Sequence, residues 1–279
     1  MDSLEGFFAY DELTHEPLAG LGWSVDAIPW RRVNVDWDQY DVVVIRSPWD
    51  YQKDPGLFLE TLGRIDRSRA RLENSLARVR WNLEKTYLKE IASKGVTTVP
   101  TLWLSGLADR SIPDLCGELG SDEIVVKPIV GANADDTFRL GPGSEEDIAL
   151  AMACFLDRDL MAQPFLREIV ERGEYSLFYF GGEYSHAVLK KPKPGDFRVQ
   201  EEHGGGICPV KPERDLLAAG QRVMESLGES LLYARVDLVR LPGGEPALME
   251  LELIEPSLYF SYDTESPKRF ARALDRLFH

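Results

Sequence analysis

The chain has 279 residues, a length that predicts about two compact domains. Apolar residues make up 44% of the chain and charged residues 28%, as in ordinary globular proteins with a buried core. The formal net charge is −15, which argues against a protein that binds nucleic acid or an anionic membrane through a broad basic surface. No stretch approaches 18 consecutive apolar residues, and the acidic N-terminus does not resemble a signal peptide, so we expect a cytoplasmic protein.

The three cysteines and four histidines are scattered along the chain. Cys116, Cys154 and Cys208 form no Cys-x-x-Cys pair, so we expect reduced thiols. The spacing of the histidines does not suit a zinc site, which argues against a transition-metal enzyme.

The N-terminal part is predicted to be a small α/β domain. Residues 25–28 and 41–46 have the patterns of strands, and residues 13–21 and 55–65 those of helices. This alternation favours a parallel sheet, whose ligands bind beyond the carboxyl ends of the strands. Residues 46–51 follow such an end and combine a cation, a hydroxyl group and two aromatic rings.

The middle of the chain is predicted to mix helices and strands. A helix is expected over 80–94, followed by strands over 101–104 and 124–127. A helix over 145–155 and a short strand over 160–163 come next.

The remainder is predicted to form two hairpins around a helix. Strands over 174–180 and 183–190 flank Gly181-Gly182, a strong turn signal. The helix is expected over 213–227, the second hairpin over 232–254, and a C-terminal helix from Pro267 with Ser266 as its N-cap.

The second hairpin brings acidic residues together. If its turn is centred on Gly243-Gly244, Asp237 faces Glu250 and Arg235 faces Glu252, all on one side of the strands. The other side is a predicted core made of Ala234, Val236, Leu238, Met249, Leu251 and Leu253.

Three carboxylates in one patch require positive charge nearby. Two unit charges 4 Å apart repel by about 4 kcal/mol at an effective dielectric constant of 20, and Arg235 supplies one charge only. Carboxylate oxygens suit Mg²⁺ or Mn²⁺, which bridge them to phosphate oxygens. The alternative is a half-buried hairpin with an acidic face in solvent.

Basic residues gather in two other places. Residues 186–198 contain Lys190, Lys191, Lys193 and Arg198 against one acidic residue, ahead of the glycines at 204–206. A basic loop over phosphate and a solvated loop both explain this stretch. Lys127 ends an apolar strand before a loop of small residues, where its ammonium group would either contact phosphate or face solvent.

A rigid apolar linker, Gln163–Leu166, follows the strand at 160–163 and could flank a flat base, with Glu174 within reach of a ribose. An ordinary connection between elements is the alternative. The chain contains neither a P-loop nor a Gly-x-Gly-x-x-Gly motif after a strand, so both of those nucleotide-binding classes lack their fingerprint.

Taken in order, these motifs resemble the ATP-grasp superfamily over about residues 80–262. Residues 46–51, 196–202 and 255–259 are most similar to its cycloserine-biosynthesis subgroup. The resemblance implies an α/β N-terminal domain over 1–78, followed by a two-subdomain α+β ATP-grasp fold. We expect the subdomain with the phosphate lid over 79–165 and the subdomain with the metal-binding hairpin over 166–279.

The resemblance also implies roles for individual residues. Lys85 and Lys127 would contact the α- and β-phosphates of ATP, with Lys190 also in the nucleotide site. Gln163 and Leu166 would hold adenine, and Glu174 the ribose. Arg235 would steady the transferring phosphoryl group. Asp237, Glu250 and Glu252 would bind two Mg²⁺ ions, with Mn²⁺ as an alternative.

Two departures from the family pattern stand out. Glu252 occupies a position where the superfamily usually has Asn, and the loop over 131–137 contains less glycine than the usual lid. Arg46 and Arg198 are the candidates for binding a substrate carboxylate, because a guanidinium group matches a carboxylate through two hydrogen bonds.

The predicted function is an ATP-dependent ligase or cyclase. A small amino-acid-like carboxylate would attack the γ-phosphate to form an acylphosphate, and an amine would displace phosphate, leaving ADP and phosphate. A phosphotransferase acting on a small molecule and a non-catalytic nucleotide-binding regulator are the alternatives. A homodimer is expected from the family resemblance alone.

Overall fold

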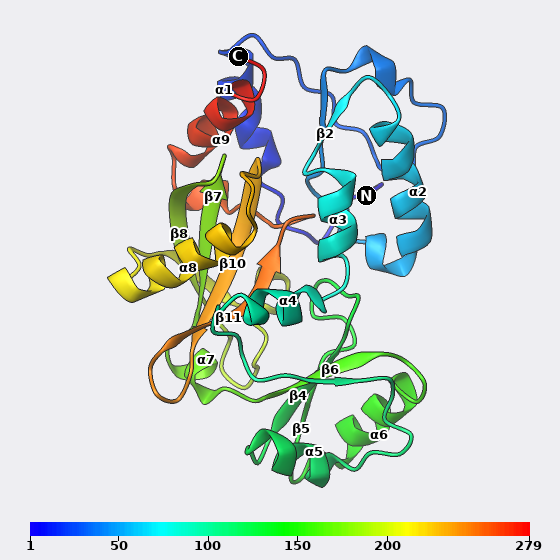
Figure 1. The fold of residues 1–279 in the computed structure, drawn as a ribbon, viewed down its shortest axis with the longest axis vertical. Coiled ribbons are helices and arrows are strands. Elements are labelled where there is room, and N and C mark those ends of the chain that lie inside the picture. Colours follow the sequence, from blue (N-terminus) through cyan, green and yellow to red (C-terminus); the bar gives the residue numbers. More distant parts are fainter.

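The computed structural model describes residues 1–279 and contains three β-sheets (Figure 1). A parallel pair is formed by β1 (Val42–Val44) and β2 (Arg71–Glu73). The four-stranded antiparallel sheet has the order β3-β6-β4-β5, and the five-stranded antiparallel sheet has the order β11-β10-β7-β8-β9. Their strands are β3 (Leu102–Leu104), β4 (Ile124–Pro128), β5 (Phe138–Leu140), β6 (Leu160–Pro164), β7 (Glu174–Phe180), β8 (Glu183–Lys191), β9 (Gly206–Pro209), β10 (Tyr233–Arg240) and β11 (Pro246–Glu252).

Nine α-helices and five 3₁₀ turns connect the strands. The α-helices are α1 (His15–Ala19), α2 (Pro55–Asp66), α3 (Leu76–Asn82), α4 (Tyr87–Ser93), α5 (Ile112–Leu119), α6 (Glu145–Cys154), α7 (Arg167–Glu171), α8 (Arg214–Ser226) and α9 (Ser266–Asp275). The 3₁₀ turns are η1 (Asp11–Thr14), η2 (Trp37–Gln39), η3 (Tyr51–Lys53), η4 (Glu201–His203) and η5 (Phe260–Tyr262). None of the helices has both the length and the apolar composition needed to cross a bilayer.

The predicted alternation of helices and strands in the N-terminal part is confirmed, except that one of the predicted strands is absent from the structure. Helix α2 begins after Asp54, whose side chain accepts a hydrogen bond from the backbone of Leu57, and it buries Phe58 and Leu62. The strand predicted at 25–28 is wrong. These residues pair with no strand of the two-stranded sheet, and Val25 is exposed.

The helix predicted over 80–94 is interrupted. Helix α3 ends at Asn82, whose side chain hydrogen-bonds to the backbones of Leu251 and Leu253 in and after β11. The backbone N–H of Lys85 then donates to the carbonyl of Ile129 instead of continuing a helix. The break between α3 and α4 therefore positions Lys85 beside the loop that follows β4.

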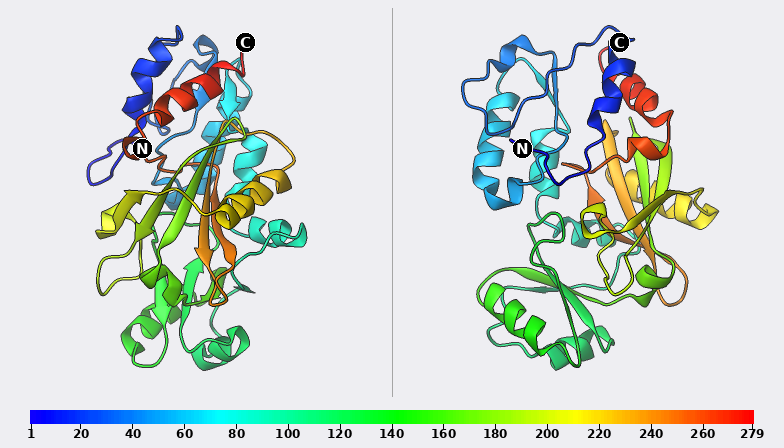
Figure 2. Two further views of the ribbon diagram at one scale, coloured as in Figure 1. Left: turned by 90° about the vertical axis from the view of Figure 1, so that its left-hand side faces the viewer. Right: turned by 180° about the vertical axis from the view of Figure 1, so that it is seen from behind.

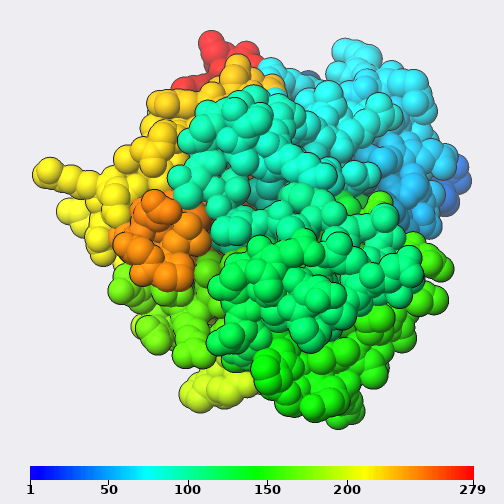
Figure 3. All heavy atoms as spheres, turned by 60° about the horizontal axis from the view of Figure 1, so that its bottom comes forward, coloured from blue at the N-terminus to red at the C-terminus, as the bar shows by residue number.

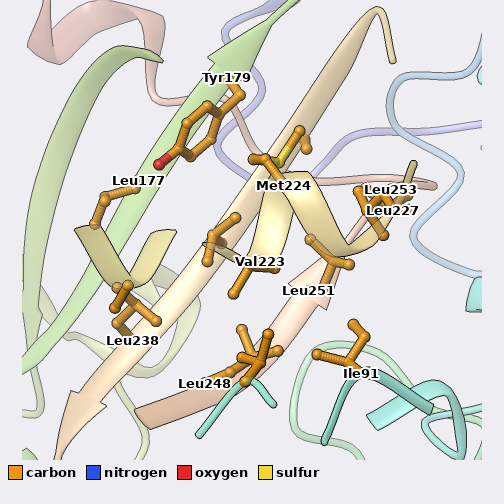
Figure 4. Packing of buried hydrophobic residues seen from close by; sticks show 14 of the residues in the cluster. Ile91, Leu177, Tyr179, Val223, Met224, Leu227, Leu238, Leu248, Leu251 and Leu253 are labelled. Carbon is orange, nitrogen blue, oxygen red and sulfur yellow. The ribbon is translucent and has the colours of Figure 1, made fainter. Parts of the chain in front are cut away.

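The largest core lies on one face of the five-stranded sheet. Figure 4 shows α8, through Val223 and Met224, and α4, through Ile91, packing against side chains of β7, β10 and β11. Helix α4 thus packs on this sheet, although the sequence prediction grouped it with the other subdomain. The boundaries at 78/79 and 165/166 remain predictions.

The opposite face of the same sheet is covered by α9. Phe270 of α9 packs with Phe180 and Tyr233, and Leu18 of α1 joins this cluster, so α1 and α9 lie side by side (Figures 1 and 2). The prediction of Ser266 as the N-cap is wrong by one residue. Glu265 is the N-cap, and Ser266 is the first residue of the helix.

The four-stranded sheet forms a separate lobe with α5 and α6 (Figure 2). Its core contains Leu115 of α5, Phe155, and alternate residues of β4 and β6. Seen from the end of the molecule, this lobe lies next to the β10–β11 turn (Figure 3), and Thr98 pairs with Leu248 near their junction.

Candidate active site

The predicted register of the acidic hairpin is confirmed for its two pairs of charged residues. Asp237 pairs with Glu250 and Arg235 pairs with Glu252. Beyond Asp237 a β-bulge shifts the register, so that Leu238 pairs with Leu248 and Met249 has no partner. The prediction that Met249 faces the core is wrong, because the bulge turns its side chain into the cleft described next.

A cleft lies between the four-stranded and five-stranded sheets. Its empty space is about 1410 Å³ when the open mouth is included. Eleven of the twelve residues predicted to act in the site line this cleft. They are Lys85, Lys127, Gln163, Leu166, Glu174, Lys190, Arg198, Arg235, Asp237, Glu250 and Glu252.

Arg46 is the exception. Its Nε atom donates to Asp11 at 2.9 Å and its Nη2 atom to the carbonyl of Pro256 at 2.8 Å, while the guanidinium group stacks over Tyr233. Arg46 does not line the cleft, so this placement does not support it as the ligand of a substrate carboxylate. Arg198 does line the cleft and forms two hydrogen bonds with Asp196.

Ion pairs organise the acidic hairpin. Arg235 pairs with Glu252 and, at 3.0 Å, with Asp237. The Nζ atom of buried Lys190 lies 2.5 Å from Glu174 and 3.4 Å from Asp237. Burial opposes ionisation of Asp237, but Arg235 and Lys190 outweigh it and lower the pKa of this carboxyl group.

The other two carboxylates of the hairpin differ from each other. Lys85 forms an ion pair with Glu250 and also donates to the carbonyl of Gly131 at 3.1 Å. Burial works against ionisation of Glu250, yet Lys85 and Lys127 keep its pKa below the ordinary value. Burial raises the pKa of Glu252 to about 7 despite Arg235, and Glu250 contributes to the increase.

Lys127 lacks an anionic partner. Its Nζ atom contacts the sulfur of Met249 at 3.8 Å and forms no salt bridge, and burial lowers its pKa. An ammonium group that is partly removed from water and has no carboxylate next to it is unfavourable unless an anion binds there. Lys127 is therefore well suited to contact a phosphate group.

The linker predicted to flank a base lies at the opposite wall of the cleft. Gln163 is buried, its side chain donates to Thr101 at 3.0 Å, and it pairs with Val125 of β4. Leu166 is buried against Val239. Phe165 of the same predicted linker stacks with Arg139 and also lines the cleft.

The loop over 131–137 is anchored rather than free. Asn133 donates to the carbonyl of Trp49 at 2.9 Å, and His203 lies 3.2 Å from the carbonyl of Asn133. Asn133 has a φ of 56°, a left-handed conformation that asparagine tolerates better than most residues. This role of Asn133 leaves no local signal in the sequence, because both contacts join segments distant in the chain.

The metal site predicted at the hairpin is only partly assembled. No three His, Cys, Asp or Glu side chains are grouped closely enough to hold a metal ion. The donor chemistry nevertheless fits Mg²⁺, since Asp237, Glu250 and Glu252 offer carboxylate oxygens only. Eight carboxylates and five basic side chains line the cleft, so a triphosphate would be repelled unless cations accompany it.

Comparison with known proteins decides the family. The model of the D-cycloserine synthetase DcsG N-terminal domain matches residues 1–74. The cycloserine biosynthesis protein DcsG of Streptomyces lavendulae is 30% identical over 266 residues, which cover 91% of this chain and 89% of the relative. The chain belongs to the ATP-grasp ligases.

Other comparisons agree with this family. A crystal structure of D-cycloserine synthetase DcsG superimposes with a TM-score of 0.84 at 28% identity, covering 96% of this chain and 94% of the other. The ATP-grasp ligase PsnB shares the fold, with a TM-score of 0.66 at 16% identity over 95% of this chain and 94% of the other. A glutathione synthetase of Bordetella parapertussis is 25% identical over 85% of this chain and 73% of the relative.

The ATP-grasp assignment confirms the predicted fold class, an α/β N-terminal part followed by an α+β ATP-grasp fold. It also confirms the predicted activity, an ATP-dependent ligase that activates a carboxylate and forms a C–N bond. The phosphotransferase alternative is not favoured.

Proposed function

We propose that this ATP-grasp ligase activates the carboxylate of a small amino-acid-like molecule and joins it to an amine. The amine belongs either to a second molecule or to the same one, in which case the product is a ring. The observation that carries the proposal is the cleft, where half-buried, unpaired Lys127 lies near a hairpin of carboxylates.

We assign each wall of the cleft to one part of ATP. The polypeptide at Gln163 and Leu166 would receive adenine, and Glu174 the ribose. Lys85, Lys127 and Lys190 would neutralise phosphate oxygens. For Lys85 and Lys190 this requires exchanging contacts, because both are paired with carboxylates before ATP binds.

The reaction follows from these positions. A substrate carboxylate oxygen attacks the γ-phosphorus, the bond to the β-phosphate oxygen breaks, and ADP leaves. Arg235 would stabilise the charge on the transferring phosphoryl group, because its guanidinium group is held rigidly by Asp237 and Glu252. The amine then attacks the carbonyl carbon of the acylphosphate, loses a proton and releases phosphate with the original carboxylate oxygen.

Asp237, Glu250 and Glu252 would hold Mg²⁺, with Mn²⁺ as an alternative. When bound, the metal supplies positive charge to the phosphate oxygens. Glu252 in place of the usual Asn adds negative charge to this ligand set. Its raised pKa of about 7 fits a carboxylate that lacks sufficient positive charge around it.

The names of the relatives suggest what the substrate resembles. DcsG takes part in cycloserine biosynthesis, and glutathione synthetase forms glutathione. We infer a substrate that carries both an amine and a carboxylate. Arg198, which lines the cleft and is half exposed, is the remaining candidate ligand for that carboxylate. A homodimer remains a prediction from the family.

A substrate panel tests this function. The protein, Mg-ATP and a library of amino acids and amines are incubated together, and ADP and phosphorus-containing products are measured. We expect carboxylate-dependent release of ADP and free phosphate in equal amounts, and loss of both in Glu250→Gln. A stable phosphoester, or no ADP with any member of a broad panel, would contradict the proposal.

A further inference from the structure

One buried carboxylate in the cleft has no cationic partner. Glu255 is only 8% exposed, lines the cleft and forms no ion pair, whereas Asp237, Glu250 and Glu252 each pair with lysine or arginine. A neutral donor, the hydroxyl group of Tyr51, lies beside it. A buried carboxylate is stable as an anion only when a positive group is close to it. Glu255 therefore has an unused capacity to bind a cation.

A second unpartnered acceptor lies two residues further along. The Oγ atom of Ser257 is buried, has no hydrogen-bond partner and belongs to a residue that lines the same cleft. Leaving a buried polar atom without a partner costs free energy that a suitable ligand would recover. Glu255 and Ser257 together offer acceptors to a group rich in N–H donors.

The backbone that carries these two side chains is held by three side-chain donors. Trp49, Arg46 and Arg235 donate to the carbonyl oxygens of residues 255, 256 and 257, at 2.7, 2.8 and 3.4 Å respectively. Pro256 restricts the same segment further. The acceptors are thus presented by a fixed backbone, which reduces the entropy lost when a ligand binds.

We infer that Glu255 and Ser257 bind the ammonium group of the substrate and select for substrates that carry one. An amine held by a carboxylate keeps its protons, so it has no free electron pair for attack on an acylphosphate. The selected ammonium group is therefore a recognition group separate from the attacking nitrogen, as the α-ammonium group of an amino acid would be. This inference rests on the proposed function.

Binding measurements test the inference without relying on turnover. Calorimetry in the presence of Mg²⁺ and ADP compares D- and L-serine with D- and L-glycerate, which replace the ammonium group by a hydroxyl group. We expect one serine enantiomer to bind wild type at least about 10-fold more tightly than the matching glycerate. Glu255→Gln should reduce this preference to less than about threefold, and Ser257→Ala should weaken serine binding by a smaller factor.

Controls separate this role from others. Glu202→Gln removes a charge from the exposed part of the same cleft and should leave the serine preference unchanged. Glu255→Gln should keep its ATP affinity and its Mg²⁺ requirement. An increased Mg²⁺ requirement would make Glu255 a metal ligand and overturn the inference.

The remaining outcomes are also decisive. The inference is overturned if wild type binds neither serine enantiomer, if it binds serine and glycerate equally, or if Glu255→Gln keeps the preference. ADP release supported equally by carboxylates without an ammonium group would overturn the inference and leave the ligase function intact. Serine binding that depends on Glu255, with no ADP release from any member of the panel, would contradict the ligase function and leave the ammonium-binding role of Glu255 intact.

Discussion

At the scale of single residues, a substitution of Glu252 tests whether the acidic hairpin binds metal. Replacing Glu252 by Asn removes one negative charge but keeps an oxygen donor. We expect the Mg²⁺ concentration for half-maximal ADP release to rise about tenfold, because divalent-cation affinity follows the charge of the ligand set. Calorimetric binding of Mn²⁺ should weaken in parallel. An unchanged requirement for Mg²⁺ would remove Glu252 from the proposed ligand set.

Arg46 has a different role from the one that its sequence context predicts. It holds the carbonyl of Pro256 and so positions Glu255 and Ser257. We expect Arg46→Ala to lower kcat/KM for the carboxylate substrate by about 10- to 100-fold, because small displacements of binding groups have large effects on rate. The KM for ATP should stay the same, and Arg46→Lys should recover part of the activity.

A second arginine provides the control for this prediction. Arg31 forms an ion pair with Asp50 in the same N-terminal part of the chain but donates to none of residues 255–257. Arg31→Ala should therefore lower the free energy of unfolding without changing KM for the carboxylate substrate. Equal losses for the carboxylate substrate and ATP in Arg46→Ala would indicate a general structural role instead.

The buried imidazole group of His186 should make the stability of the fold depend on pH. It stacks on Phe178, contacts the carbonyl of Leu258 at 3.0 Å, and burial lowers its pKa from 6.5 to about 4. Above pH 6.5 both folded and unfolded states hold it neutral. As the pH falls through 6.5 toward 4, the unfolded state takes up a proton first, so the folded state loses stability.

This loss is about 2 kcal/mol at pH 5 relative to pH 8. Urea unfolding of wild type and His186→Gln at both pH values measures it. The variant should be less stable than wild type at pH 8, and the difference should shrink by about 2 kcal/mol at pH 5. A constant difference between the two proteins would contradict the account of His186.

At the scale of elements, helix α8 is held close to the sheet by Gly220. A Cβ atom at Gly220 would lie 2.4 Å from the hydroxyl oxygen of Tyr179 and 2.9 Å from Leu177. Gly220→Ala should lower the free energy of unfolding by about 1–3 kcal/mol through overpacking, although alanine favours helices. In α5, a Cβ atom at Gly117 meets nothing within 4 Å.

Gly117→Ala is thus the matched control. It should raise the free energy of unfolding by about 0.5–1 kcal/mol, because the helix propensity of alanine acts there without a clash. Denaturant titrations of both variants measure the two effects. Stabilisation by both substitutions would show that α8 does not approach β7 as closely as described.

Most elements could be predicted from local patterns, and the exceptions have tertiary causes. The Gly181-Gly182 turn and the apolar periods of α2 and α8 identify their elements directly. The break before α4 arises from contacts of Asn82 with β11, which no local pattern reveals. The bulge beside Asp237 likewise depends on how β10 meets β11, so the orientation of Met249 was mispredicted.

At the scale of the whole molecule, the cleft is built from the four-stranded sheet, the five-stranded sheet and the segment around Trp49. Chemistry-bearing side chains such as Lys127 and Asp237 could be predicted because each has a distinctive place in a strand. The contact of Arg46 with Asp11 joins segments 35 residues apart, and its contact with Pro256 joins segments 210 residues apart. Such long-range pairing leaves no signal in one sequence, and Glu255 gains its importance only from these contacts.

The central claim is that a substrate carboxylate attacks ATP to form an acylphosphate. The most direct test uses the substrate found in the panel, with both carboxylate oxygens labelled with ¹⁸O. In the proposed reaction one labelled oxygen leaves with the phosphoryl group, so each released phosphate should carry one ¹⁸O atom. Phosphate without label, released with ADP in equal amount, would contradict the account.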